Sequence, residues 1–471
     1  MESKDRFCPY YPKPSGNVLV RWWRALRASG SLLNALTERS YRMMMGDNRV
    51  GSHRLCIVND PAAVRHILTE RARNYPKHRY MADLLEPLLG DSLFTSNGPQ
   101  WRKQRKLADS ALHAAKLDMV FPLMLDAAQA MLARLQNLPD GTPVAVDAEM
   151  AQVTADVIFR TIFSMPIEGE AARKVFEAFE TFQRLAPKAT MPRYRPTWLA
   201  RSSVDRASRA AAKKIRSLLA DMIRPRFLAR QAGQTCQTND LLASLLEASS
   251  AHDGPSVTLE ELVDLVAVLF LAGHETSASA LAWSLHLLAH SASVQERMAE
   301  EALAAWTEPA AQVRDLRSLD LCKRVFRESL RLFPPIGFLV REAAAADEVR
   351  DKQIDPGTTM VVSPWLIHRH RLFWERPDEF DPDRYLSHAG AESAKSAYLP
   401  FSLGPRACPG AGFAMQEAHL LLAMLARRFR FEPLAGHVPM PVARLTTRSS
   451  NGVVLRLFRR QPLPLPTSGA C

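Results

Sequence analysis

The sequence predicts a mainly helical protein with a minor β component. Glycine is sparse, with 20 in 471 residues, and aromatic residues make up only 8%, whereas sandwiches and barrels usually need many glycine turns. In addition, apolar residues recur with helical spacing over most of the chain, while runs that alternate like strands are few and short. No linker divides the chain, so we expect one large domain.

The expected elements begin with a strand at 50–60 and a short helix at 61–68, whose first turn holds Pro61. Helical periodicity then recurs at 99–136, 146–164, 170–185, 201–230, 238–249, 258–291, 294–306, 318–333 and 409–430. Strand-like stretches lie at 338–341, 358–364 and 452–458, and proline-, glycine- and charge-bearing loops at 76–98, 186–200 and 373–400. We expect an N-terminal segment at 1–49, one domain at 50–458 and a flexible tail at 459–471.

Composition and charge exclude several classes of protein. With 47% hydrophobic and 23% charged residues, the chain is neither disordered, collagenous nor a coiled coil. Its net charge of +12 suggests an acidic partner. However, this charge is spread along the chain and no nucleic-acid recognition module is present, which disfavours nucleic-acid binding.

Cysteine usage and hydropathy bear on the compartment. Six cysteines are scattered without close pairing, which indicates a reducing environment. The first residues are polar and do not form a signal peptide or membrane anchor. The most apolar window, Leu262 to Leu288, is interrupted by Asp264, His274 and Glu275, so a buried core helix explains it better than a membrane span. We therefore expect a soluble, cytoplasmic protein.

The strongest chemical signal is the segment Phe401-Ser-Leu-Gly-Pro-Arg-Ala-Cys-Pro-Gly410, which precedes a predicted helix. Cys408 lies at the start of that helix, where free backbone N–H groups and the helix dipole favour a thiolate. Arg406 can hold a negative group on a ligand. Three glycines leave room for a flat ligand near the backbone: Gly404, Gly410 and Gly412. The segment predicts a thiolate presented to a soft metal, with an inert buried cysteine as the alternative.

A second segment, Leu271-Ala-Gly-His-Glu-Thr276, lies in the middle of the predicted helix at 258–291. Thr258 and Glu261 form a capping-box pattern at the start of this helix. A mid-helix glycine costs about 1 kcal/mol relative to alanine, so Gly273 indicates that another group packs closely there. The H-E-x-x-H zinc motif is not completed, because residue 278 is alanine. A polar patch on a core helix is the plain alternative.

Glu328 and Arg331 are three residues apart on one predicted helix face, just before Pro334-Pro335. A surface ion pair is the usual meaning of this spacing, and Glu170 with Arg173 shares it. The proline stop and the position ahead of the cysteine segment single out the later pair.

Two more pairs carry weaker signals. Trp101 and Arg105 share a helix face and together can hydrogen-bond a carboxylate, with a solvated basic helix end as the alternative. His368 and His370 have no acids or cysteines nearby that would complete a ligand set, so we expect an ordinary polar cluster and not a metal site.

Taken together, these segments resemble the cytochrome P-450 superfamily. The cysteine segment matches every fixed position of the family's haem-ligand pattern, F-x-x-G-x-R-x-C-x-G. The resemblance implies the P-450 fold, with haem between the long oxygen-binding helix and the helix that follows the cysteine loop. It implies that Cys408 is the axial ligand of the haem iron, with cofactor contacts from Phe401, Arg406 and Gly410. Because no anchor precedes it, a soluble, bacterial-type member is favoured.

The second segment is similar to the family's A-G-x-E/D-T motif. By resemblance, Ala272 and Gly273 lie next to the haem, and Gly273 opens room for dioxygen. Glu275 and Thr276 would then form the acid–alcohol pair that delivers protons to bound oxygen.

The resemblance also gives roles to charged residues. It implies contacts to the haem propionates from Trp101, Arg105 and Arg341. It implies a buried structural salt-bridge cluster of Glu328, Arg331 and Arg384. There are two small departures from the family patterns, Pro409 for an aliphatic residue and Asp383 for a glutamate.

The substrate is the least constrained feature. By resemblance, an apolar set lines the pocket and suits a terpenoid, fatty-acyl, polyketide or aromatic skeleton: Met81, Leu84, Phe94, Phe270, Ile336, Phe338 and Leu445. Arg193 and Arg195 are candidates to meet a substrate carboxylate, with solvated loop charges as the alternative.

The resemblance implies a haem-thiolate monooxygenase that uses dioxygen to hydroxylate a hydrophobic substrate, as in secondary metabolism. It implies haem b and NAD(P)H-derived electrons from a separate donor, such as a ferredoxin and its reductase, and we expect a monomer. Arg102, Lys103 and Lys106 would dock that acidic donor. The alternatives are a haem-thiolate peroxygenase or isomerase, which Glu275 and Thr276 argue against, and a non-catalytic haem protein.

Overall fold

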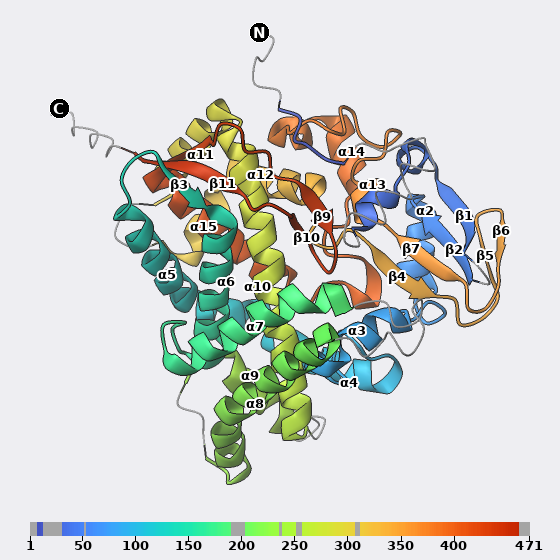
Figure 1. The fold of residues 1–471 in the computed structure, drawn as a ribbon, viewed down its shortest axis with the longest axis horizontal. Helices are drawn as coiled ribbons and strands as arrows, with labels where there is room; N and C mark the ends of the chain where they lie inside the picture. Colours follow the sequence, from blue (N-terminus) through green and yellow to red (C-terminus); the bar gives the residue numbers. More distant parts are fainter. Residues whose placement is uncertain are drawn as a thin grey trace.

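Helices dominate the computed structural model of this chain (Figure 1). The structure describes residues 7–12, 31–50, 53–189, 203–234, 238–250, 257–306 and 311–460. The helices in the first half are α2 Pro61–Arg65, α3 Arg79–Leu89, α4 Gly98–Ala111, α5 Ala114–Gln136, α6 Val146–Phe163, α7 Glu170–Ala189 and α8 Ser203–Gln231. Those in the second half are α9 Leu241–Ser250, α10 Leu259–Ala289, α11 Ala292–Ala305, α12 Asp320–Leu332, α13 Pro364–Ile367, α14 His388–Ala397 and α15 Ala411–Arg428.

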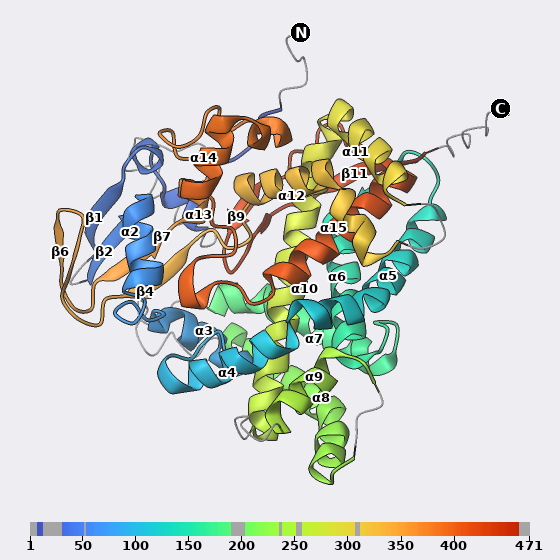
Figure 2. The same cartoon turned by 180° about the vertical axis from the view of Figure 1, so that it is seen from behind.

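The strands of the described residues form four small sheets, and the largest lies to one side of the helices (Figures 1 and 2). Its order is β1–β2–β7–β4, with β2 parallel to β7 and the other neighbours antiparallel. The other sheets are β3–β11–β8, β9–β10 and β5–β6. The strands are β1 Met45–Val50, β2 His53–Val58, β3 Thr142–Ala145, β4 Leu339–Glu342, β5 Asp347–Val349, β6 Lys352–Ile354, β7 Thr359–Val362, β8 Phe429–Pro433, β9 Pro441–Ala443, β10 Thr447–Ser449 and β11 Val454–Arg459.

The helix α10 runs through the middle of the molecule (Figures 1 and 2), in contact with α6, α8 and α12. Its predicted capping box is present, because Thr258 Oγ1 accepts from the Glu261 N–H at 3.2 Å and Glu261 Oε2 accepts from the Thr258 N–H at 2.9 Å. By length and composition α10 could cross a membrane, but 78% of its most apolar window is buried inside the fold. It is therefore the core helix that the interrupted apolar window predicted.

Two expected loops and one expected helix differ in the structure. The expected loop at 76–98 contains α3, because burial of Leu85, Leu88 and Leu89 outweighs the internal Pro87. The expected loop at 373–400 likewise contains α14. The predicted helix at 99–136 is two helices, with a break between Ala111 and Ala114.

The folded unit extends closer to the N-terminus than the expected start at residue 50. The strand predicted at 50–60 is one arm of the β1–β2 hairpin, which begins at Met45. Before it, the side chains of Leu33, Leu36 and Tyr41 are buried in the main core, and Tyr41 Oη accepts a hydrogen bond from Trp365 Nε1 at 2.9 Å. Residues 461–471 of the predicted tail lie outside the described residues.

Candidate active site

A cavity of about 1560 Å³ lies between α10 and the cysteine segment. Its wall also includes residues of α3, α4, α6, α7 and β4 and of the loop between β9 and β10. The cavity brings together most of the residues for which the resemblance implied a ligand-binding role: Leu84, Phe94, Trp101, Arg105, Ala272, Gly273, Glu275, Thr276, Ile336, Phe338, Arg341, Phe401, Arg406, Cys408, Gly410 and Leu445.

The remaining predicted wall residues lie elsewhere. Phe270 is fully buried and packs against the rings of Phe159, Phe179 and His274. Its side chain thus faces the α6–α7 side of α10, and its expected place in the cavity wall is wrong. The side chain of Met81, in α3, lies outside the described residues, as do Arg193 and Arg195.

Cys408 lines the cavity from the turn before α15 and is accessible from it. Its N–H donates to the Phe401 carbonyl oxygen at 2.8 Å, and Arg105 Nη1 donates to the Ala407 carbonyl oxygen at 2.6 Å. Burial raises the pKa of the Cys408 thiol, while the Gly410 N–H and the Arg105 guanidinium act in the opposite direction. Coordination to a metal deprotonates such a thiol, so the expected thiolate stays a prediction.

The glycines of the cysteine segment serve mainly to pack protein against protein. Gly404 has a φ of 70°, and a Cβ there would come within 2.2 Å of the Leu68 carbonyl oxygen. A Cβ at Gly412 would lie 3.2 Å from Leu117 Cδ1, whereas one at Gly410 would meet only Cys408 Sγ, at an ordinary 3.9 Å. Gly404 is therefore fixed by its backbone conformation and by its neighbour, and not by a ligand as we expected.

The facing wall is formed by α10. A Cβ at Gly273 would come within 2.6 Å of Ile158 Cδ1, so the close neighbour predicted from this mid-helix glycine is α6. Thr276 Oγ1 donates to the Ala272 carbonyl oxygen at 2.6 Å. Because the hydroxyl hydrogen is used within the helix, the oxygen lone pairs of Thr276 remain available on the cavity side.

The carboxyl group of Glu275 is held by two other elements. Its Oε1 accepts from Thr446 Oγ1 at 2.6 Å, and its Oε2 accepts from Gln183 Nε2 at 3.2 Å. Burial raises the pKa of Glu275, while the Thr446 hydroxyl and the Arg448 guanidinium lower it. Glu275 and Thr276 share the cavity wall, but no hydrogen bond joins their side chains among the described contacts.

Three cations line another part of the cavity, with Arg341 buried and Lys77 and Arg406 half-buried. Lys77 and Arg341 are joined by an isolated β-bridge, and the Arg406 guanidinium lies 4.3 Å from the centre of the Trp101 ring. Burial lowers the pKa of Lys77 well below its usual range, and burial lowers the pKa of Arg341 and of Arg406 to about 10. Within the described residues, no carboxylate pairs with any of the three.

This arrangement fits a ligand that is largely apolar and carries carboxylates, because buried cations without counter-ions favour an acidic ligand. An accessible cysteine in the same cavity adds a soft metal ligand. Haem, with its iron and its two propionates, matches both features. Arg105, expected to meet a propionate, lines the cavity and donates to Asp109 Oδ1 at 2.8 Å and to carbonyl oxygens of the cysteine loop; its contact with a propionate stays a prediction. Lys77 offers a further cation that the sequence motifs missed.

Comparison with known proteins agrees with this site. The sequence model of the family described as Cytochrome P450 matches residues 31–455. The chain belongs to the cytochrome P450 family. It is therefore an oxidoreductase of the monooxygenase type, and the family uses haem, dioxygen and electrons from a reductant.

Individual relatives come from bacteria and plants. This P450 is 30% identical to the cyclooctatin synthase of Streptomyces melanosporofaciens, over 82% of this chain and 83% of that one. It is 29% identical to the cytokinin hydroxylase of Arabidopsis thaliana, over 88% and 79%. The crystal structure of the cytochrome P450DA heme domain superposes with a TM-score of 0.82 at 25% identity, over 97% of this chain and 99% of that one. With plant enzymes among the relatives, a bacterial-type assignment stays a prediction.

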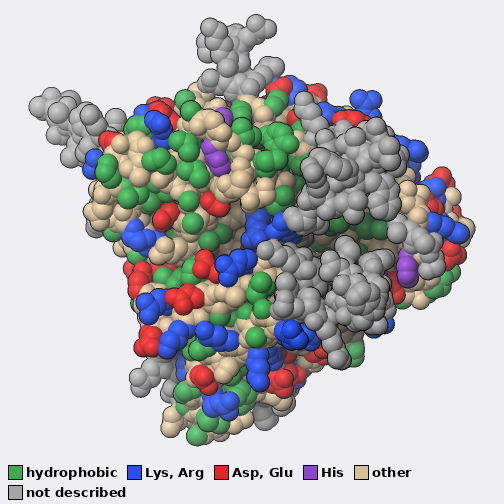
Figure 3. All heavy atoms as spheres, in the orientation of Figure 1, with side chains coloured by type: hydrophobic (Ala, Val, Ile, Leu, Met, Phe, Trp, Pro, Cys, Tyr) green, Lys and Arg blue, Asp and Glu red, His purple; other side chains and the backbone are tan. Residues whose placement is uncertain are grey.

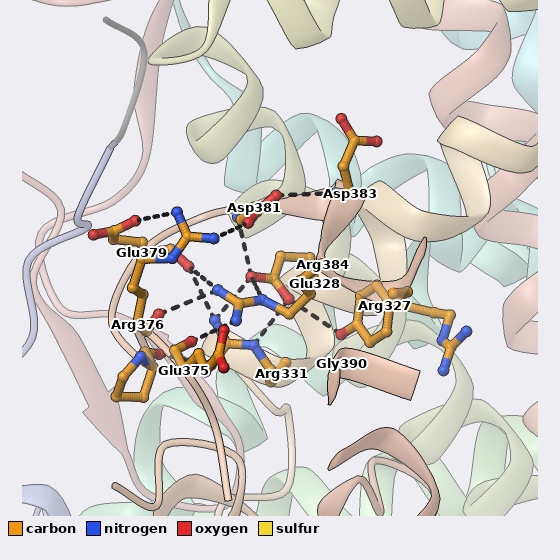
Figure 4. Close-up of polar contacts among 12 residues, drawn as sticks. Arg327, Glu328, Arg331, Glu375, Arg376, Glu379, Asp381, Asp383, Arg384 and Gly390 are labelled. Atoms are coloured by element: carbon orange, nitrogen blue, oxygen red, sulfur yellow. Dashed lines mark hydrogen bonds and ion pairs between the residues drawn. The ribbon is translucent and has the colours of Figure 1, made fainter. Parts of the chain in front are cut away.

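The predicted cluster of buried charge is present in this P450 (Figure 4). Glu328 accepts from Arg331 Nε and Nη2, both at 2.8 Å, and from Arg384 Nε at 2.9 Å. The Tyr385 hydroxyl and the Asp381 N–H add two more donors, each at 3.1 Å. Burial alone would raise the pKa of Glu328, but the two guanidinium groups hold it below its ordinary value. The charge of Glu328 is thus balanced within the protein.

The histidine pair plays a local structural part. The Leu399 N–H donates to His368 Nε2 at 2.9 Å, and Arg331 Nη1 donates to the His368 carbonyl oxygen. His370 Nε2 lies 3.2 Å from the Met43 carbonyl oxygen, and its ring stacks on Phe373. Among the described residues, no group of three or more His, Cys, Asp or Glu side chains is placed to hold a metal ion.

Of the three basic residues expected to dock an electron donor, one is already paired. Lys103 Nζ forms an ion pair with Glu261 Oε1 at 2.5 Å, so Lys103 is part of the contact between α4 and α10. Arg102 and Lys106 are exposed. On the face shown in Figure 3, Lys and Arg side chains are interspersed with acidic ones, which agrees with the spread of charge along the sequence.

Proposed function

We propose that this P450 is a haem-thiolate monooxygenase that hydroxylates a hydrophobic organic substrate. The observation that carries the proposal is the single cavity shared by Cys408, the three cations and the Ala272–Thr276 segment of α10. Cys408 would ligate the iron of haem b, and Arg341, Arg406 and Lys77 would hold its propionates. When bound, the haem supplies the iron centre at which dioxygen is activated.

Beyond the cofactor, the chain's own residues orient the reactants and handle protons. Thr276, with its lone pairs toward the cavity, would hold a water molecule in the cavity, and Glu275 would hold a proton on its carboxyl group for transfer to that water. The apolar wall, which includes Leu84, Phe94 and Phe338, would hold a terpenoid, fatty-acyl, polyketide or aromatic skeleton. Hydroxylation is supported by the relative named as a cytokinin hydroxylase.

Electrons would come from NAD(P)H through a separate acidic carrier such as a ferredoxin. A monomeric, cytoplasmic enzyme is consistent with the dispersed surface charge and the scattered cysteines. The rival functions, a peroxygenase or an isomerase, would not need the proton-handling side chains of Glu275 and Thr276.

The test is the spectrum of the reduced carbonyl complex. The purified protein should contain haem b, and its carbonyl complex should show the red-shifted Soret band of thiolate ligation. Cys408→His should abolish this band, while Cys8→Ser, which alters an exposed cysteine far along the sequence, should leave it unchanged. A band that survives in Cys408→His would reject Cys408 as the ligand, and absence of haem from the wild-type protein would reject the function.

A further inference from the structure

Gln183, in α7, bridges two neighbouring side chains of α10. Its Nε2 lies 3.0 Å from His274 Nε2 and 3.2 Å from Glu275 Oε2. The same glutamine lines the large cavity. Neither the sequence motifs nor the family resemblance gave it a role.

The contacts of His274 fix which end of the Gln183 amide is the NH₂ group. His274 Nδ1 lies 3.0 Å from the Phe270 carbonyl oxygen, and a carbonyl oxygen only accepts, so Nδ1 carries the hydrogen. Burial lowers the pKa of His274 to about 4, which leaves the ring neutral and its Nε2 an acceptor. Gln183 Nε2 must therefore be the donor, and its two hydrogens are directed to His274 and Glu275.

With both amide hydrogens used, the carbonyl oxygen of Gln183 is the group left for another molecule. Among the described residues no donor contacts this oxygen, and it is not one of the fully buried polar atoms that lack a partner. The cavity wall also includes the apolar side chains of Ile158, Ile162 and Phe182. An acceptor held in a fixed orientation among apolar side chains selects for a hydrogen-bond donor, because an apolar or acceptor group there would leave it unpaired.

The charges on the same wall restrict the kind of donor. The Glu275 carboxyl group disfavours an anion beside Gln183, and the Arg448 guanidinium, which also lines the cavity, disfavours a cation. A neutral O–H group satisfies both restrictions. We propose that Gln183 is a substrate-binding residue whose Oε1 accepts a hydrogen bond from a hydroxyl group on an otherwise apolar substrate. This inference rests on the proposed function, since it assigns part of the substrate-binding wall.

The proposal has a consequence for the substrate class. If the skeleton already carries a hydroxyl before this enzyme acts, an earlier reaction must have placed it there, and this P450 adds oxygen at another position. The hydroxyl held by Gln183 would fix which part of the skeleton is presented to the reacting centre.

The first test uses the wild-type holoenzyme and two ligands with the same skeleton, the alcohol adamantanol and the ketone adamantanone. Isothermal titration calorimetry measures their binding without requiring turnover. The alcohol should bind about tenfold more tightly than the ketone, as expected for one hydrogen bond made or missing in an apolar site. Equal affinity for alcohol and ketone, or preference for the ketone, would overturn the proposal, because a ketone can accept but not donate.

The second test compares Gln183→Leu with Ile162→Val, an apolar change in the same wall. In Gln183→Leu the dissociation constant of the ketone divided by that of the alcohol should fall from about ten to about one, whereas Ile162→Val should weaken both ligands equally and keep this ratio near ten. A ratio that persists in Gln183→Leu would show that another group binds the hydroxyl. These outcomes do not depend on the carbonyl-complex spectrum, so failure here and failure of the monooxygenase proposal are distinguishable.

Discussion

Glu328 is a buried and Lys77 a half-buried charged residue of this P450, and their surroundings differ. The Glu328 carboxylate accepts hydrogen bonds from Arg331, Arg384 and two further donors. Among the described residues, the Lys77 ammonium group donates to two main-chain carbonyl oxygens, those of Leu93 at 2.8 Å and Phe94 at 2.9 Å, and to no carboxylate. The guanidinium groups lower the pKa of Glu328 in spite of its burial, whereas burial lowers the pKa of Lys77.

The presence or absence of a counter-ion within the protein distinguishes a charged group that stabilises the fold from one that can bind a ligand. A buried ion whose partners lie within the protein is stable as it stands, and removing one partner is costly. A buried cation without an acidic partner is unfavourable in the ligand-free protein, and a bound anion relieves this cost. By this reasoning the Glu328 cluster is structural, and we propose that the cluster of Lys77, Arg341 and Arg406 binds an acidic group of the cofactor.

The largest expected effect tests the structural side of the comparison. Glu328→Ala leaves two buried guanidinium groups without their counter-ion and should lower the free energy of unfolding by about 3–5 kcal/mol. Little soluble, haem-loaded protein should be obtained. Glu170→Ala is the matched control, because Glu170 begins the other Glu-x-x-Arg pattern but is an exposed partner of Lys174, and it should be neutral. Normal yield and haem content of Glu328→Ala would contradict the structural role of the Glu328 cluster.

The ligand side of the comparison is tested by Lys77→Met. Loss of one charge-assisted contact to a carboxylate should weaken haem retention about 10- to 100-fold. Transfer of haem to a scavenging protein, followed by absorbance, measures this retention. The haem-free variant should be at least as stable as the wild type at neutral pH. Lys395→Met, which removes a surface lysine paired with Glu392, should retain haem normally; equal retention by both variants would separate Lys77 from the cofactor.

The same substitution predicts a pH dependence. The folded-state pKa of Lys77 is lowered by burial, so between that value and the ordinary lysine value the unfolded chain binds more protons. The haem-free wild type should therefore gain stability as pH rises through this window, by at most about 1.4 kcal/mol per pH unit. Urea unfolding of haem-free wild type and Lys77→Met over a pH series should show a shallower slope for the variant. Parallel slopes would mean that Lys77 keeps its ordinary pKa.

These two clusters also show what the sequence could predict. Glu328 and Arg331 are close in sequence on one helix, so helical spacing was sufficient to pair them, and Cys408 belongs to a contiguous segment. Lys77 could not be found in this way, because its contacts come from a β-bridge to Arg341, far along the chain. Gln183 and Thr446 were missed for the same reason, since they meet Glu275 from other elements.

Where local patterns misled, tertiary packing is the cause. Gly404 is shaped by its approach to Leu68 and not by a ligand. Phe270 has the spacing of a cavity residue on α10 but packs toward Phe159 and Phe179. The helix α3 forms despite Pro87, because its leucines are buried.

A smaller effect, on coupling and not on binding, is expected at Thr276. Its hydroxyl is satisfied by the Ala272 carbonyl, so Thr276→Ala should keep haem and substrate binding. Loss of the oxygen lone pairs should impair proton delivery. Product formed per electron consumed should fall several-fold while hydrogen peroxide rises, measured with Thr181→Ala in α7 as the control. Unchanged coupling in Thr276→Ala would remove this hydroxyl from the proposed mechanism.

The smallest expected effect is on the rate of reduction and concerns basic residues on the surface of α4. Lys103 is paired with Glu261, as Glu328 is paired inside, whereas Arg102 and Lys106 are exposed and have no ion pair among the described contacts. Only the latter two are then available to an acidic electron carrier. In low salt, the double variant Arg102→Glu, Lys106→Glu should be reduced by a ferredoxin a few-fold more slowly than the wild type. This difference in rate should vanish when added salt brings the Debye length below about 8–10 Å. Lys103→Glu should instead disturb the α4–α10 contact and lower stability, with a salt dependence of reduction like that of the wild type. Stopped-flow measurement of the reduction rate across a salt series, together with thermal unfolding of each variant, separates the two roles. If the variant with both Arg102→Glu and Lys106→Glu is reduced at the wild-type rate in low salt, the docking surface lies elsewhere.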